Sequence, residues 1–149
     1  MLLIGVTLGV GLWLPLIVDI LGFALFPIGI VEGLAALTIM LIGLGLRGWA
    51  AVTLGGYYTR TLTTTKDHRV VTTGPYAWVR HPAYLGVILL WLGFGVLSGS
   101  LVIALVFPVM FVAVYLYRIS VEEEMLVQVL GDSYVQYQRR TRRLIPFVY

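Results

Sequence analysis

The sequence predicts an all-α integral membrane protein that crosses the bilayer several times. Of its 149 residues, 60% are hydrophobic and 11% are charged, whereas typical soluble domains are about 45–50% apolar and about 25% charged. A soluble domain of this length could not bury so much apolar surface, and the same composition excludes intrinsic disorder. A polytopic membrane protein is the class that remains, in agreement with a mean hydropathy of +0.97.

The N-terminal third predicts two spans joined by a connection. Residues 2–18 carry no charge and would form about 25 Å of helix. They lack the basic start and the small-residue cleavage site of a signal peptide, so we expect a retained first span. Residues 20–31 contain Pro27 and are too short to cross alone, which predicts a lumenal or re-entrant connection. Residues 33–51 form the second predicted span.

The uncharged stretch 83–117 predicts a helical hairpin. As a single helix it would measure about 52 Å, far more than a hydrocarbon core of about 30 Å. Ser98-Gly99-Ser100 lies near its middle and is a turn signal. We therefore expect two spans, at roughly 83–97 and 101–118.

From Ser120 onward the chain becomes polar and amphipathic. Four apolar residues share one face at helical spacing: Met125, Leu126, Val129 and Leu130. Gly131 is expected to end this helix, and Asp132 or Ser133 is expected to cap a second short helix.

The basic residues predict the orientation in the membrane. All ten lie either in the loop 47–82 or in the segment from Arg118 onward, and the connections 19–32 and 98–100 carry none. The positive-inside rule places the loop and the C-terminal segment in the cytoplasm. Four spans with both termini in the cytoplasm satisfy this rule. A five-span alternative, in which residues 20–31 also cross, would place the N-terminus outside.

Two polar blocks are predicted to face each other at the cytoplasmic side, because the two ends of a hairpin lie together. The first is GPYAWVRHPAYLG, residues 74–86, and the second is RISVEEE, residues 118–124. Arg118 and Glu122 are four residues apart and share a helix face.

The residue types in these blocks suit a ligand with amino-acid and nucleoside parts. An arginine can pair with a carboxylate, and glutamates can accept from hydroxyl or ammonium groups. Aromatic walls would come from Tyr76, Trp78 and Tyr84. A purely structural interpretation also stays open, since an exposed pair such as Arg118–Glu122 is worth only about 0.3–0.5 kcal/mol, and Trp78 and Arg80 would serve as interface anchors.

The motifs resemble those of the isoprenylcysteine carboxyl methyltransferase family. The segment GPYAWVRHPAYLG looks like the family signature, and R-x3-EE-x2-L-x4-G-x2-Y-x2-Y, ending in RRLIP, is similar to its C-terminal block. The resemblance covers roughly residues 44–149. It implies a single membrane methyltransferase domain over residues 1–149, with N-terminal spans in 1–43 and a cofactor-binding core in 44–149.

The resemblance also implies a cofactor, an acceptor and a place for the site. The methyl donor would be S-adenosyl-L-methionine, bound at the cytoplasmic face and covered by the C-terminal segment. The acceptor would be lipid-like or prenylated, most simply an isoprenylcysteine-type carboxylate, and would arrive from the membrane lipids through a tunnel.

The implied cofactor-binding residues come from both blocks. They are Tyr76, Arg80, His81, Pro82, Tyr84, Gly86 and Arg118, together with one or both of Glu122 and Glu123. Arg118 and Glu123 are also the catalytic candidates, although a carboxylate acceptor is already ionised near neutral pH and needs no general base. Glu124 is expected to face solvent. Tyr134 and Tyr137 would either line the site or anchor the segment that covers it.

Three other functions stay open at this point: a phospholipid amine N-methyltransferase, an NADPH-dependent enzyme similar to sterol reductases, and a non-enzymatic membrane scaffold. Sterol reductases usually carry Arg-Asp-Glu where this chain has Glu122-Glu123-Glu124. Without cysteine and with only His68 and His81, no metal site is expected. The basic run 139–143 predicts a tether to anionic lipid, and no nucleic-acid partner is expected.

Overall fold

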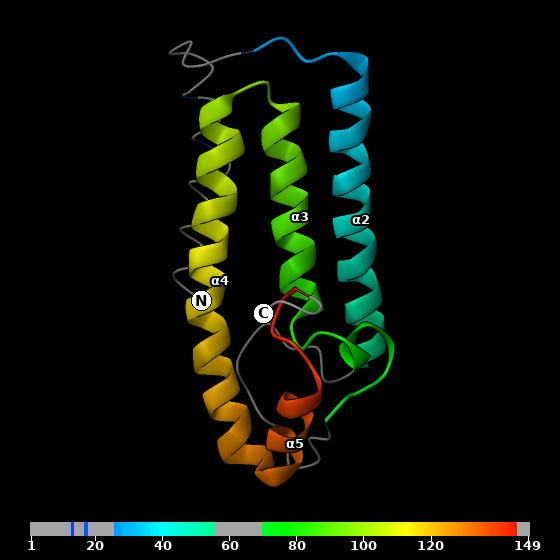
Figure 1. Ribbon diagram of the computed structural model, residues 1–149, viewed down its shortest axis with the longest axis vertical. Coiled ribbons are helices and arrows are strands. Elements are labelled where there is room, and N and C mark those ends of the chain that lie inside the picture. The colour runs from blue at the N-terminus through cyan, green and yellow to red at the C-terminus, as the bar shows by residue number, and fades with distance from the viewer. Residues whose placement is uncertain (1–12, 14–16, 18–25, 56–69, 146–149) are drawn as a thin grey trace. The chain divides into compact units, whose positions relative to one another are not determined.

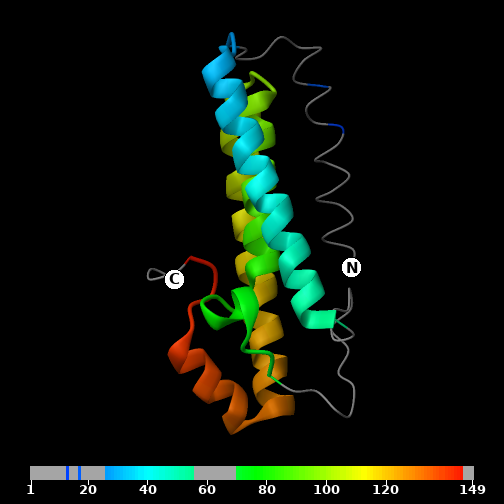
Figure 2. The same ribbon diagram turned by 90° about the vertical axis from the view of Figure 1, so that its right-hand side faces the viewer.

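The computed structural model describes residues 13, 17, 26–55 and 70–145. Within these ranges the chain forms helices and no strand (Figures 1 and 2). The elements are α2 (Ile30–Leu54), the 3-10 helix η2 (Gly74–Ala77), α3 (Pro82–Leu97), α4 (Leu101–Leu130) and α5 (Asp132–Arg140). The predicted all-α class is thus confirmed for the described residues. The predicted first span and His68 lie outside them, apart from Trp13 and Ile17.

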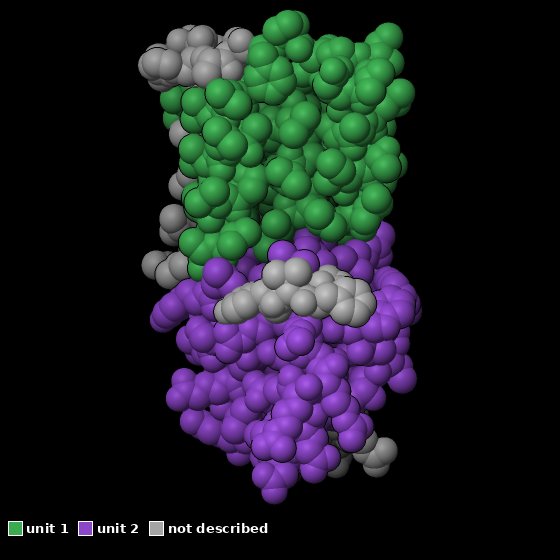
Figure 3. All heavy atoms as spheres, in the orientation of Figure 1, with its two compact units in different colours: residues 1–44, 87–114 green, residues 45–86, 115–149 purple. Residues whose placement is uncertain are grey.

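The chain divides into two compact units (Figure 3). Unit 1 comprises residues 1–44 and 87–114, and unit 2 comprises residues 45–86 and 115–149. Asp19 and Glu32 are the charged residues of unit 1, whereas all ten basic residues belong to unit 2. Unit 1 therefore has the composition expected of helices embedded in a bilayer, and the charged side chains that could form a polar site belong to unit 2.

Helix α2 is slightly longer than the predicted second span, and it is apolar and long enough to cross a membrane. The residues before it, 26–29, are not helical, and Phe26 N donates a hydrogen bond to Gly99 O at 2.7 Å. Residues 26–29 are thus a non-helical connection in front of α2, and residues 20–25 lie outside the described part. The number of spans stays a prediction.

The predicted hairpin is confirmed as α3 and α4, which run in opposite directions in unit 1 and turn at residues 98–100. Trp91 of α3 stacks on Phe107 and Phe111 of α4, with ring centroids 5.4 and 4.9 Å apart. Phe107 and Phe111 are almost fully buried. These stacked rings form the centre of the unit 1 core.

Close helix contact in unit 1 depends on Gly93. A Cβ atom at this position would lie 2.5 Å from Ala36 O and 2.6 Å from Met40 Cγ of α2. Ala36 itself is 1% exposed. Small residues that let backbones approach in this way are the usual basis of helix packing in membranes.

Helix α4 continues to Leu130, so the predicted span and the amphipathic helix after it are one continuous helix. It ends at Gly131, as predicted, where φ is 58°, a left-handed conformation that glycine adopts without a Cβ clash. The predicted side-chain cap of α5 is wrong. Gly131 itself is the N-cap and makes no side-chain bond, and Ser133 Oγ donates back to Leu130 O at 2.7 Å.

Candidate functional site

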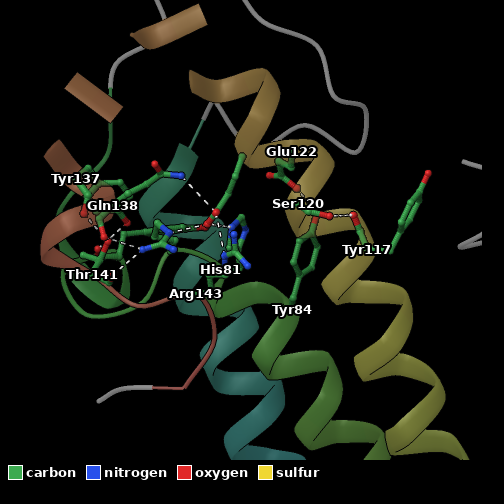
Figure 4. A network of polar contacts seen from close by, with 12 residues as sticks. His81, Tyr84, Tyr117, Ser120, Glu122, Tyr137, Gln138, Thr141 and Arg143 are labelled. Carbon is green, nitrogen blue, oxygen red and sulfur yellow. Dashed lines mark hydrogen bonds and ion pairs between the residues drawn. The ribbon is translucent and has the colours of Figure 1, made fainter. Parts of the chain in front are cut away.

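The two polar blocks meet within unit 2, as predicted, at the carboxylate of Glu123 (Figure 4). Oε1 accepts from Arg80 Nε at 2.6 Å and lies 3.2 Å from His81 Nε2, which donates in the tautomer that carries its proton there. Oε2 accepts from Arg143 Nε at 3.1 Å and from Gln138 Nε2 at 3.3 Å. The Glu123 side chain is only 5% exposed. Four donors therefore surround one buried carboxylate.

Arg80 extends this network to the end of α5. Its Nη1 donates to Gln138 O at 3.1 Å and to Thr141 O at 2.5 Å. Carbonyl groups at the end of a helix lack partners within the helix, and a cation there also interacts favourably with the helix dipole. Arg80 thus satisfies the C-terminal end of α5 while it pairs with Glu123.

Backbone hydrogen bonds join the segment after α5 to the segment before α3. Arg142 N donates to Trp78 O at 3.1 Å, and Arg80 N donates to Arg142 O at 2.8 Å. His81 N donates to Arg143 O at 3.1 Å. Val79 and Arg142 consequently form an isolated parallel bridge. We call residues 78–82, which end in His81-Pro82, the His-Pro loop and residues 141–145 the C-terminal tail.

Tyr137 provides a further attachment between α5 and η2. Its hydroxyl group donates to Tyr76 O at 2.8 Å, and both side chains are buried. Burial raises the pKa of Tyr137 to about 12, so the hydroxyl keeps its proton and remains a donor at physiological pH. Of the two roles left open for Tyr137, the structure thus places it as an anchor.

A second polar chain runs through Tyr84. Arg118 Nε donates to Tyr84 Oη at 2.6 Å, and Tyr84 Oη donates to Glu122 Oε2 at 2.6 Å. The Tyr84 ring is stacked between His81 and Tyr115, with ring centroids 5.6 and 4.7 Å apart. The hydroxyl group of Tyr84 therefore bridges the two charged residues that the sequence placed on one helix face.

Other predicted site residues have varied environments. Pro82 begins α3 and is buried, Gly86 is buried in the same helix, and Glu124 is exposed as expected. Trp78, predicted either as an aromatic wall of the site or as an interface anchor, is 63% exposed and makes an edge contact with Trp49, and its role stays a prediction.

The basic run near the C-terminus has a role that the sequence analysis missed. Arg139, Arg140 and Arg142 are exposed, as a lipid tether requires, but Arg143 binds Glu123 and the tail backbone pairs with the His-Pro loop. No local pattern indicates this pairing, because the partners are about 60 residues apart and the tail has no strand periodicity. In the described ranges, no group of three or more histidine or acidic residues is placed to hold a metal ion.

Comparison with known proteins decides the family. The sequence model of the isoprenylcysteine carboxyl methyltransferase (ICMT) family matches residues 36–128, which include Arg80, His81, Tyr84, Arg118, Glu122 and Glu123. The chain belongs to this family. Together with two apolar helices long enough to cross a bilayer, this membership shows an integral membrane protein.

The chain is similar to three known proteins. A protein-S-isoprenylcysteine O-methyltransferase of Schizosaccharomyces pombe is 37% identical over 116 residues, which are 76% of this chain and 49% of that protein. The solved structure of a eukaryotic intramembrane Ras methyltransferase of the ICMT family matches with a TM-score of 0.74 and 29% identity, over 78% of this chain and 42% of that one. A cobalt-zinc-cadmium resistance protein, CzcN of Cupriavidus metallidurans, is 28% identical over 92% of this chain and 63% of its own length. The chain spans about half the length of the curated ICMT relative and of the solved structure.

Proposed function

We propose that the chain is an S-adenosylmethionine-dependent methyltransferase that acts on the carboxylate of an isoprenylcysteine. One observation carries this proposal. The two motif blocks of the family, 74–86 and 118–124, come together through Glu123 and Tyr84 in a chain that belongs to the family. The proposal places the site in unit 2, at the cytoplasmic face, with both termini on the same side.

The residues in unit 2 fit the methyl donor by their chemistry. Glu122 is half-buried, and its Oε1 accepts no hydrogen bond from the residues that the structure describes, so it suits an ammonium or hydroxyl group. Arg118 carries the charge that a carboxylate group requires. When bound, S-adenosylmethionine supplies an electrophilic methyl group on a positively charged sulfur.

The acceptor needs little from the protein beyond placement. An isoprenylcysteine carboxylate is already ionised near neutral pH, so no side chain has to remove a proton. The protein would instead align the carboxylate with the methyl group and exclude water from both. The nearly uncharged composition of unit 1 suits the delivery of a lipid-like acceptor from the bilayer.

A labelling experiment tests the activity and the acceptor together. The full chain, purified and reconstituted in vesicles, would be incubated with methyl-labelled S-adenosylmethionine and N-acetyl-S-farnesylcysteine. We expect label in the farnesylcysteine, released as methanol by mild alkali as a methyl ester is. The methyl ester of the same compound is the matched control and should take up no label. Label in phosphatidylethanolamine instead would indicate an amine methyltransferase and would contradict the proposed acceptor.

A further inference from the structure

Two adjacent glutamates of α4 have different surroundings. Glu123 is 5% exposed and its two oxygens face four nitrogen donors. A carboxylate offers about four lone-pair positions, so little capacity remains for a ligand. Glu122 is half-buried and accepts one hydrogen bond, from Tyr84, among the described residues. The capacity to bind a ligand is therefore concentrated on Glu122.

The donors around Glu123 come from three segments that also bind one another: the His-Pro loop, the end of α5 and the C-terminal tail. Arg80 and His81 belong to the His-Pro loop, Gln138 belongs to the end of α5, and Arg143 belongs to the C-terminal tail. Arg80 also holds the carbonyl groups of residues 138 and 141. Removing the charge of Glu123 would therefore loosen both the tail and the residue that holds the end of α5.

We propose that Arg80 and Glu123 form a tail clasp, a positioning pair that fastens the C-terminal tail to the His-Pro loop, and that Glu122 is the glutamate that faces the methyl donor. This inference rests on the proposed function for the identity of the ligand. The clasp itself rests on contacts within unit 2 and is testable without any methyl donor. It narrows the predicted set of cofactor contacts, which included Arg80 and one or both of Glu122 and Glu123.

The clasp predicts different effects for the two glutamates. Glu123→Gln opens the tail in a fraction of the molecules, so the apparent affinity for the donor falls in proportion to the fraction that remains closed. KM for the donor therefore rises. A saturating concentration of donor restores the closed form, so kcat stays within about threefold of the wild-type value. Glu122→Gln removes a direct contact and weakens donor binding with the tail still closed.

Hydrogen exchange on the full chain in lipid nanodiscs reads the clasp directly. The peptides to follow cover residues 78–82 and 141–145, which contain the three amides of the loop–tail pairing. We expect exchange in both peptides to become at least tenfold faster in Glu123→Gln and in Arg80→Lys. In the double variant the acceleration should be smaller than the product of the two single accelerations, because both substitutions break the same Arg80–Glu123 pair, although Arg80 also holds residues 138 and 141 and Glu123 also holds Arg143. Glu122→Gln and the exposed control Glu124→Gln should match the wild type within twofold.

Donor titrations complete the test, with S-adenosylhomocysteine as the probe. Saturation should restore slow exchange in Glu123→Gln. The inference is overturned if Glu123→Gln weakens binding of the probe while exchange stays slow, or if Glu122→Gln speeds exchange of the tail. If Glu123→Gln does not fold, Arg143→Gln removes one donor of the four and should give a smaller acceleration in the same peptides. If the wild-type protein binds no probe, the proposed function fails while the exchange data still decide the clasp.

Discussion

At Tyr84, one hydroxyl group joins two oppositely charged side chains of α4. It accepts from Arg118 and donates to Glu122, both at 2.6 Å, and the ring is held between His81 and Tyr115. A tyrosine stacked in this way has little freedom, so its hydroxyl fixes the distance between the two charges. The pair is then preorganised for a ligand that carries both an ammonium and a carboxylate group.

The Tyr84→Phe variant tests this bridge, because it keeps the stacked ring and removes the hydroxyl group. A hydrogen bond to a charged group contributes about 1.5–3 kcal/mol. We expect S-adenosylhomocysteine to bind roughly tenfold or more weakly, as measured by calorimetric titration in detergent. Unchanged affinity in a folded Tyr84→Phe protein would show that the bridge does not organise the site.

Replacing Arg118 with lysine tests the other side of the Tyr84 bridge. Lysine keeps the positive charge but loses the planar group whose Nε holds Tyr84. We expect a loss of donor affinity similar to that of Tyr84→Phe, and no further loss when the two substitutions are combined. The exposed Glu124→Gln control should change binding by less than about 0.5 kcal/mol. Equal sensitivity at Glu124 would mean that the acidic residues act only as diffuse charge.

At the scale of elements, the packing of α3 against α2 depends on the absence of a side chain at Gly93. A methyl group there would meet Ala36 O at 2.5 Å, and a backbone carbonyl cannot rotate away as a side chain can. We expect Gly93→Ala to lower the free energy of unfolding by about 1–3 kcal/mol, as measured by denaturant titration in mixed micelles.

Gly45 of α2 is the matched control for this variant. No heavy atom lies within 4 Å of a Cβ built at Gly45. Alanine there should be neutral or stabilising by up to about 1 kcal/mol, since it favours helix formation. If both variants behaved alike, close packing at Gly93 would not be what stabilises unit 1.

The sequence predicted the hairpin elements well because their signals are local. A long charge-free stretch with Ser98-Gly99-Ser100 at its middle fits a bilayer as a helical hairpin that turns at these residues. Gly131 marked the end of α4. The continuity of α4 through residue 120 was not predicted, because a change from apolar to polar residues changes the surroundings of a helix without breaking it. The approach of the two polar blocks followed from the hairpin alone.

The detailed geometry of the site was not predictable in the same way. Arg80 and Glu123 were predicted to lie at a cofactor site, but their pairing with each other and with the C-terminal tail was not predicted. That pairing joins segments far apart in the sequence, and neither periodicity nor charge pattern encodes it. Which of several nearby charges pair is determined by tertiary structure.

At the scale of the whole molecule, charge is distributed unevenly between the two units. All ten basic residues belong to unit 2, and unit 1 carries two acidic residues. The positive-inside rule then predicts that the His-Pro loop and the C-terminal tail face the cytoplasm. The turn at residues 98–100 should face the opposite side.

Cysteine labelling tests this orientation cleanly, because the chain contains no cysteine. Single variants Thr72→Cys and Ser98→Cys would be treated in sealed vesicles with a thiol reagent that cannot cross the bilayer. We expect the two positions to react from opposite sides of the membrane. Reaction of both from one side would contradict the proposed orientation.

Calorimetric titration of the purified full chain with S-adenosylhomocysteine and, separately, with NADPH distinguishes a site for a sulfonium methyl donor from a reductase site. We expect saturable binding of S-adenosylhomocysteine, little affinity for NADPH, and at least tenfold weaker binding of S-adenosylhomocysteine in Glu122→Gln. Saturable binding of NADPH without binding of S-adenosylhomocysteine would rule out the proposed site and would indicate a reductase.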